Sequence, residues 1–260
     1  MKRLLWFLPL LLVVSVSAAP TLTTAGTSSL SALLKDVTTR GDVPGVVVAV
    51  VNQDGLLYHE AFGLSRTVGS QPMARDTIFN MASMTKPITS TAVMMLVDEG
   101  KLKLDDDVAK YLPKYKEAVV ISKFNEADAS YETRPAKRPI TIRQLLTHTS
   151  GIGYAFGSPM LTKIMQKTGK GEMDLPLLFD PGESWAYGPS TRVLGYVVEA
   201  ISGQKIDAYL QSRVLGPLGM GLSPGGVSGA RRTCARWIAQ GRHDEDEAGV
   251  SAEERRPVQR

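Results

Sequence analysis

The sequence predicts an α/β region followed by an all-α region, and three observations support this fold class. A helical pattern and two strand patterns come first, helical patterns dominate from Thr85 onward, and apolar periodicity ends after Met220. The length of 260 residues and the hydrophobic fraction of 43% suit one large domain or two small ones. We therefore expect 19–79 to be the first part of the α/β region, 80–220 to be the helical region and 221–260 to be a tail.

The predicted α/β region opens with a helix and a β-hairpin. Leucine and valine recur at helical spacing over Thr27–Thr38. After Pro44 the period changes, because Gly45–Val51 is a continuous run rich in β-branched residues, which is typical of a buried strand. Asp54-Gly55 indicates a hairpin turn, and Leu56–Phe62 is predicted to be the return strand.

The helical region is predicted from apolar stripes and from the residues that bound them. Ile88–Val97 is apolar on nearly every side, which predicts a helix inside the core, and Gly100 follows its end. Ser190 is placed to cap a helix whose apolar stripe runs to Ile201. Two further helical segments are expected, at Leu161–Met165 and Ile206–Leu215.

The sequence indicates neither a metal site nor a nucleic-acid interface. The acidic run Asp105–Asp107 has two interpretations, a metal site and charges at a helix N-terminus. No His or further carboxylate follows at ligand spacing, so we expect the second. The net charge of +4 is small and evenly spread, which argues against nucleic acid as a partner. No metal and no cofactor are expected.

The N-terminal segment 1–18 has the pattern of a signal peptide. A positive start at Met1–Arg3 precedes the apolar run Leu4–Val14, and small residues lead to an expected cleavage site after Ala18. The alternative is a membrane anchor, but the apolar run is too short to span a bilayer. We therefore expect an exported chain, periplasmic or extracellular, without a stable membrane anchor after cleavage. Its one cysteine, Cys234, excludes an intrachain disulfide.

Ser83 and Lys86 form an S-x-x-K motif at the start of the predicted core helix. Three residues are close to one helical turn, so the hydroxyl and the amine face the same way. A helix N-terminus favours negative charge on Ser83, and burial disfavours the charged form of Lys86, which would then accept the serine proton. Most S-x-x-K matches are chance pairs of exposed residues, but the apolar helix that follows gives this one the context of a site.

Four segments, in order, resemble motifs of the serine β-lactamase and penicillin-binding-protein superfamily, and most closely those of class C β-lactamases and their carboxylesterase relatives. The segments are Asp76–Ile88, Leu145–Ile152, Pro181–Tyr187 and Gly216–Met220. The resemblance covers about 30–220 and implies a β-lactamase/transpeptidase-like fold with the site between the α/β and helical regions. The family continues with further strands and a closing helix, so the resemblance implies a C-terminally truncated chain. After Met220, Gly, Ser, Arg and Glu dominate and few residues are hydrophobic, so we expect a disordered or frameshifted tail.

The resemblance also implies a catalytic role for Tyr187, which stands where the family has the Tyr of its Y-x-N motif. A nearby ammonium ion stabilises a phenolate, which relays protons to a leaving group. The alternative is an aromatic residue packed under a Pro-Gly turn. Pro189 replaces the Asn of the motif, which counts against efficient β-lactam hydrolysis and resembles the esterase branch. The family's third motif is not found after Tyr187, and Lys167–Gly169, which has its letters, is interpreted as a coincidence.

Other candidate sites have weaker support. Gly221–Gly225 matches the G-x-S-x-G pattern but lacks the strand and helix that a nucleophile elbow needs. His59, His148 and His243 are scattered, which argues against a zinc hydrolase. We expect His148 to hydrogen-bond within its Thr/Ser-rich turn and His59 to be an ordinary strand residue.

The expected function is hydrolysis of a small-molecule ester or amide through an acyl-Ser83 intermediate, with Lys86 and Tyr187 transferring protons. A carboxylesterase-like activity is favoured. The first alternative is a β-lactamase or a D-Ala-D-Ala carboxypeptidase-type peptidase. The alternative of another class is a truncated remnant without catalytic activity.

Overall fold

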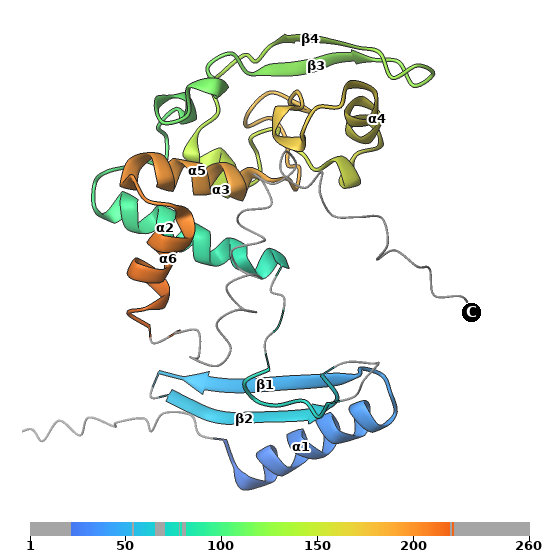
Figure 1. Cartoon of the computed structure of the whole chain (residues 1–260), viewed down its shortest axis with the longest axis vertical. Coiled ribbons are helices and arrows are strands. Elements are labelled where there is room, and N and C mark those ends of the chain that lie inside the picture. Colours follow the sequence, from blue (N-terminus) through green and yellow to red (C-terminus); the bar gives the residue numbers. More distant parts are fainter. Residues whose placement is uncertain are drawn as a thin grey trace, which may run out of the picture. The chain divides into compact units, whose positions relative to one another are not determined.

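The computed structural model describes residues 22–53, 55–65, 71–77, 79, 82–218 and 220. The expected signal peptide, the G-x-S-x-G match, Cys234, His243 and the tail at 221–260 lie outside these residues. The chain divides into two compact units, Met1–Ile78 and Phe79–Arg260. The elements α1, β1 and β2 belong to the first unit, and all later elements belong to the second (Figure 1). Within the described parts, no helix combines the length and the apolar character needed to cross a membrane.

The first unit is a helix followed by a β-hairpin, as predicted. Its elements are α1 (Thr24–Thr39), β1 (Gly45–Asn52) and β2 (Gly55–Gly63). The strands pair antiparallel, with Asn52 opposite Gly55. The Asn52 Oδ1 atom accepts a hydrogen bond from the Gly55 N–H at 3.0 Å, which closes the turn. Helix α1 packs mainly against β2.

Strand β1 is not the buried strand that its β-branched run predicts. Its residues are half-buried or exposed, and the Val51 side chain is 67% exposed. Among the described residues of this unit, β1 has one strand partner, β2, and one helix, α1, in contact with it. A strand becomes buried only when layers cover both of its faces, so apolar composition alone predicts too much burial here.

The second unit is mainly helical and also contains the β3–β4 hairpin, which the sequence analysis does not predict. Its α-helices are α2 (Thr85–Asp98), α3 (Ile142–Leu146), α4 (Pro159–Thr168), α5 (Ser190–Ser202) and α6 (Ile206–Leu210), and its strands are β3 (Val119–Phe124) and β4 (Tyr131–Pro135). Short 3₁₀ turns lie at Ala82–Met84, Val108–Lys110, Pro113–Tyr115, Ala155–Gly157 and Glu172–Asp174, and a π-helical turn, Gln211–Leu215, extends α6. The signal for the hairpin is the β-branched run at the start of β3.

Helices α2, α5 and α6 pack against one another in the core of this unit (Figure 1). Helix α5 buries the apolar stripe that was predicted. Helix α2 buries one face only, and Met94 on another face is 38% exposed, so the prediction of a helix surrounded by core is wrong. Burying a large apolar side chain contributes about 1.5–3 kcal/mol. The residues that do so here are Val93 and Leu96 on α2 and Val193, Leu194, Val197 and Val198 on α5.

Ser190 does not cap α5, contrary to the prediction. Pro189 occupies the N-cap position, and Ser190 is the first helical residue. Its side chain is fully buried, and its Oγ atom lies 3.1 Å from the Ser150 Oγ atom. The serine therefore links the start of α5 to the turn that contains Ser150. At the other end, Gly203 adopts the left-handed conformation expected of a glycine that ends a helix.

The side chains of the acidic run Asp105–Asp107, for which a metal site was one interpretation, form hydrogen bonds and ion pairs with other residues of the chain. Asp107 caps the turn Val108–Lys110 by accepting a hydrogen bond from the Ala109 N–H at 2.8 Å. Asp105 forms a two-point ion pair with Arg143, at 2.7 and 2.9 Å. In the described ranges, no cluster of three or more His, Cys, Asp or Glu side chains is arranged to hold a metal ion.

Asp180 anchors the segment that follows α4 to strand β4. Its carboxylate is fully buried and accepts two hydrogen bonds from the Arg134 guanidinium, at 2.9 and 2.5 Å. The Lys137 N–H donates a third at 2.8 Å. These hydrogen bonds, above all those from Arg134, hold the pKa of Asp180 well below its usual range.

Replacing Asp180 with Asn should lower the melting temperature by several degrees at pH 7, because a neutral amide cannot match the two donors of Arg134. The pKa of Asp180 is lower in the folded chain, so its stabilisation is present above the unfolded value of about 3.9 and is lost as the pH falls. Thermal unfolding of both proteins from pH 7 to about pH 3 should therefore show a difference that shrinks in acid.

Asp105→Asn is the matched control, since it removes a two-point pair with arginine that is exposed to solvent and should cost little. If Asp180→Asn has as small an effect as Asp105→Asn, or a difference that does not change with pH, then Asp180 is not the anchor described here.

Candidate active site

Ser83 and Lys86 lie one turn apart at the start of α2. Ser83 belongs to the 3₁₀ turn Ala82–Met84, and Lys86 is the second residue of the helix. The Lys86 Nζ atom donates a hydrogen bond to the Ser83 Oγ atom at 3.2 Å. Ser83 is exposed, whereas only 8% of Lys86 is accessible to solvent. The candidate nucleophile is therefore accessible, and the amine beside it is sheltered.

The backbone immediately before Ser83 is strained. Ala82 has a φ of 43°, in a left-handed region that an L-residue adopts at a cost of about 1–2 kcal/mol. No side chain caps α2 at Met84, so the positive end of the helix dipole is not neutralised there by a side-chain acceptor. Strained residues are often found at functional sites, and a helix N-terminus stabilises negative charge that develops on a serine oxygen.

The structure brings Tyr187 to this pair. The Lys86 Nζ atom lies 4.7 Å from the centroid of the Tyr187 ring and 5.6 Å from that of the Tyr154 ring. Burial of the phenol raises its pKa, but hydrogen bonds with Lys86 and Ser83, together with the charge of Lys86, outweigh burial. The pKa of Tyr187 consequently lies below the ordinary tyrosine value. The three residues proposed from the sequence thus lie close together within the second unit.

Tyr187 is held in place by the segment Thr147–Tyr154, which runs beside the segment Gly182–Gly188. The Ala186 N–H donates to the His148 carbonyl at 3.0 Å, and the Tyr154 N–H donates to the Tyr187 carbonyl at 3.3 Å. These hydrogen bonds lie on both sides of the tyrosine. The backbone of Tyr187 is therefore fixed relative to residues that are adjacent to α3 in the sequence.

Gly188 allows these two segments to approach closely, and Gly151 allows the first of them to approach Phe179. Gly151 has a φ of 86°, and a Cβ atom at this position would lie 2.4 Å from the Phe179 carbonyl oxygen. A Cβ atom at Gly188 would lie 2.0 Å from the Ile152 carbonyl oxygen. Any other residue at Gly188 would push the two segments apart and shift the neighbouring Tyr187. The sequence analysis did not single out Gly188, although it directly follows the tyrosine motif.

The His148 side chain does not hydrogen-bond within its turn, contrary to the prediction. Its Nδ1 atom is buried without a partner, and its backbone has a φ of 57°. The ring instead packs against Tyr187, with centroids 4.8 Å apart, and edge-on against Trp185 at 6.3 Å. Burial and, to a smaller extent, the charge of Lys86 lower the pKa of His148, which favours a neutral ring beside the tyrosine.

Neither Pro189, which replaces the Asn of the family motif, nor Lys167–Gly169, which has the letters of the third motif, contributes a group to this site in the structure. Pro189 is the N-cap residue of α5 and has no side-chain amide to offer a substrate. Lys167 lies in the last turn of α4 and donates to the Asp128 carbonyl at 2.8 Å, and Gly169 ends that helix with a φ of 67°. The Lys-Thr-Gly sequence thus forms the end of a helix.

Three aromatic residues near the site were missed by the sequence analysis. The rings of Tyr154 and Phe156 stack with centroids 4.7 Å apart, and those of Trp185 and Tyr187 stack at 6.3 Å. Phe156 is 80% exposed and Trp185 is 63% exposed. Phe156 shortly follows the motif segment Leu145–Ile152, and Trp185 lies within the motif segment Pro181–Tyr187. This proximity to the motifs was the signal that could have identified both residues.

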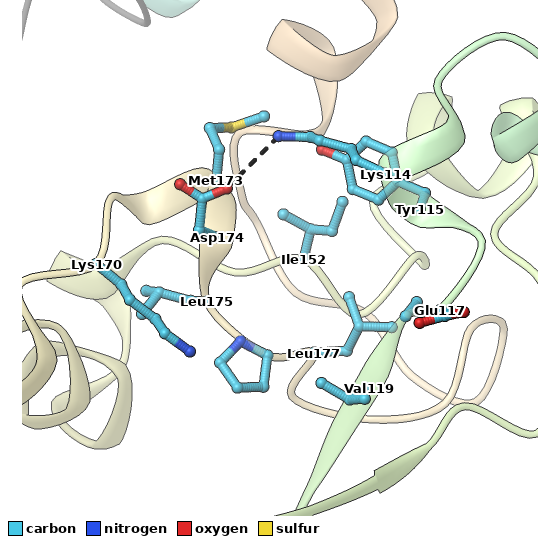
Figure 2. Close-up of a pocket in the computed structure, with 12 residues that line it drawn as sticks. Lys114, Tyr115, Glu117, Val119, Ile152, Lys170, Met173, Asp174, Leu175 and Leu177 are labelled. Atoms are coloured by element: carbon cyan, nitrogen blue, oxygen red, sulfur yellow. Dashed lines mark ion pairs between the residues drawn. The ribbon is translucent and has the colours of Figure 1, made fainter.

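A cavity of about 220 Å³ lies elsewhere in the second unit (Figure 2). Its wall includes Val119, Leu177 and the ion pair between Lys114 and Asp174, whose charged atoms are 3.7 Å apart. The wall contains none of the three candidate catalytic residues. Size alone does not select a reactive site, so we place the candidate site where a nucleophile and proton-transfer groups converge, at Ser83.

Comparison with known sequences supports a family assignment. The family model described as Beta-lactamase matches residues 30–249, which continues past Met220, where the resemblance seen in the sequence ends. Protein Rv1367c of Mycobacterium tuberculosis is 36% identical over 199 residues, which are 73% of this chain and 49% of that protein. Lovastatin esterase of Penicillium rubens is 34% identical over 194 residues, 69% of this chain and 48% of the esterase. The chain thus spans about half the length of these curated relatives.

Solved structures agree with this assignment. Unliganded simvastatin synthase from Aspergillus terreus has a TM-score of 0.68 at 27% identity, covering 78% of this chain and 57% of the synthase. EstCE1, described as a hydrolase with promiscuous acyltransferase activity, has a TM-score of 0.63 at 27% identity and covers 75% of this chain and 53% of that structure. The chain belongs to the Beta-lactamase family and has a β-lactamase/transpeptidase-like fold.

Proposed function

We propose that this chain supplies the nucleophile of a serine hydrolase that acts on small-molecule esters through an acyl-Ser83 intermediate. One observation carries the proposal: the Lys86 Nζ atom lies 3.2 Å from the Ser83 Oγ atom and 4.7 Å from the centroid of the Tyr187 ring. Relatives named as esterases, from Penicillium rubens and Burkholderia gladioli, support an ester as the substrate class.

In the proposed acylation step, the Ser83 oxygen attacks the ester carbonyl carbon while its proton passes to the Lys86–Tyr187 pair. The bond between the carbonyl carbon and the alcohol oxygen then breaks. The alcohol leaves with the proton, which Tyr187 is placed to donate. Water next attacks the carbonyl carbon of acyl-Ser83, and the bond between that carbon and the serine oxygen breaks. The carboxylic acid leaves, and a proton returns to the serine oxygen. The sum of the two steps is hydrolysis of one ester by one water.

The same intermediate also permits acyl transfer, in which an alcohol takes the place of water in the second step. This second candidate is favoured by relatives named as acyltransferases, such as acyltransferase calJ of Penicillium decumbens, and by the similarity to simvastatin synthase. The two activities share the Ser83 chemistry and differ in the acceptor. Measuring acid and ester products in the presence of an added alcohol distinguishes them.

A fluorophosphonate probe should label Ser83 in the 260-residue chain, because an exposed serine oxygen beside an amine is an activated nucleophile. Intact mass and peptide mapping measure the label. Ser83→Ala should abolish labelling, while Ser122→Ala, which removes an exposed serine on β3, should not. If folded protein is not labelled at Ser83, or if labelling survives in Ser83→Ala, the assignment fails. The first of these results would favour the inactive-remnant alternative.

Tyr187 should ionise at lower pH than an ordinary tyrosine, whose pKa is about 10. The titration of Tyr187 is measured as the difference in tyrosinate absorbance between the chain with Tyr187 and the Tyr187→Phe variant. Lys86→Met should raise the midpoint, because it removes a hydrogen bond and a positive charge that favour the phenolate. Lys114→Met, which removes a cation near the Tyr115 ring, should leave the midpoint unchanged. A midpoint that does not respond to Lys86→Met would show that the two groups are not coupled.

Short-chain aryl esters should be better substrates than cephalosporins, because Pro189 offers no amide to hold a β-lactam. The comparison is kcat/KM for an aryl butyrate and for a cephalosporin, measured with the same protein. A large preference for the cephalosporin would instead favour the β-lactamase or peptidase alternative.

Tyr187→Phe should lower kcat for the ester by about a hundredfold or more, because it removes the hydroxyl proposed to transfer protons.

A further inference from the structure

The candidate proton-transfer residue Tyr187 belongs to a set of five rings that contact one another. We call this set the ring cluster, and it consists of His148, Tyr154, Phe156, Trp185 and Tyr187. The ring centroids of Tyr154 and Tyr187 are 5.6 Å apart, and every other member contacts one of these two. The cluster is therefore continuous, with Tyr187 in contact with three of the other rings.

The outer rings of the cluster are open to solvent. Phe156 and Trp185 are the most exposed members, and Met84, which directly follows Ser83, is 67% exposed. Contiguous exposed apolar surface is unfavourable in water, and such patches commonly mark binding sites. Scattered exposed apolar residues need no explanation, but these side chains adjoin or include residues of the candidate catalytic group.

The position of the ring cluster beside Tyr187 indicates which part of the substrate would contact it. A group that gives a proton to a leaving oxygen must lie within hydrogen-bond reach of that oxygen. The alcohol part of an ester bound at Ser83 therefore lies next to the Tyr187 hydroxyl. Two rings flank Tyr187 at shallow or moderate angles, Trp185 at 23° and Tyr154 at 55°. Aromatic faces of this kind favour flat apolar groups.

We propose that the ring cluster is the binding site for the alcohol part of the ester, and that it selects flat, apolar alcohols such as aryl alcohols. This inference rests on the proposed function, because it assigns the alcohol side of the same reaction. It makes Phe156 and Trp185 specificity-determining residues, which neither accept nor donate a proton during the reaction.

Equilibrium binding of 2-naphthol to the full chain tests the cluster without any turnover. We expect 2-naphthol to bind more tightly than 1-butanol. Trp185→Ala and Phe156→Ala should each weaken 2-naphthol binding about three- to tenfold, the loss expected for one aromatic contact. Phe124→Ala is the matched control, because it removes a half-buried ring from the β3–β4 hairpin, which contributes no ring to the cluster. Circular dichroism establishes that each variant is folded.

A second measurement locates the bound alcohol. If 2-naphthol occupies the ring cluster, it should slow fluorophosphonate labelling of Ser83, and at the same 2-naphthol concentration this protection should be weaker in Trp185→Ala. Once turnover is measurable, the ratio of kcat/KM for 2-naphthyl acetate to that for ethyl acetate should also fall in this variant.

The outcomes separate the two proposals. Failure of Ser83 labelling in the absence of 2-naphthol contradicts the proposed function, whereas the binding data still decide whether the rings hold an aryl alcohol. Unchanged 2-naphthol affinity in both Trp185→Ala and Phe156→Ala overturns the inference about the cluster, whether or not Ser83 is reactive. Binding that does not protect Ser83 overturns it as well.

Discussion

The candidate site depends on the pairing of two loop segments, Thr147–Tyr154 and Gly182–Gly188. Ser83 and Lys86 are brought together by a single helical turn, but Tyr187 reaches them only because these segments lie side by side. The pairing in turn requires a glycine at Gly188, where a Cβ atom would overlap the Ile152 carbonyl. Buried Asp180 ties the chain just before the second segment to β4, so an ion pair remote from the reactive atoms supports their geometry.

The electrostatic arrangement follows from this geometry. Lys86 is sheltered and lies against two tyrosine rings, whose faces attract a cation. The lowered pKa of His148 keeps that ring neutral at neutral pH, so it adds no second positive charge beside Lys86. The lowered pKa of Tyr187 increases its phenolate fraction at a given pH. The positive charge of Lys86 thus acts on one phenol and one hydroxyl.

Much of the local structure was predictable from sequence, because it depends on neighbouring residues. The S-x-x-K spacing, the hairpin at Asn52–Gly55 and the apolar stripe of α5 all depend on contacts within a few residues or on one periodicity. The burial of β1 and of α2 was overestimated, since burial depends on what packs against an element. His148 was misassigned for a similar reason: its partners are rings from a segment more than thirty residues away. The ring cluster was not predicted because its members converge only through tertiary pairing.

Ser83 and Lys86 are close to each other in the sequence, whereas Tyr187 is far from both, and this difference affects the order in which the site forms. Closing a short loop costs little chain entropy, and a helical turn forms far faster than a contact between distant segments. Ser83 and Lys86 can therefore meet as soon as α2 forms. The contact of either residue with Tyr187 must wait until the chain between them has folded around α3, α4 and the β3–β4 hairpin. Ser83 consequently gains its amine neighbour early in folding, and its phenol neighbour only when the second unit has acquired its tertiary structure.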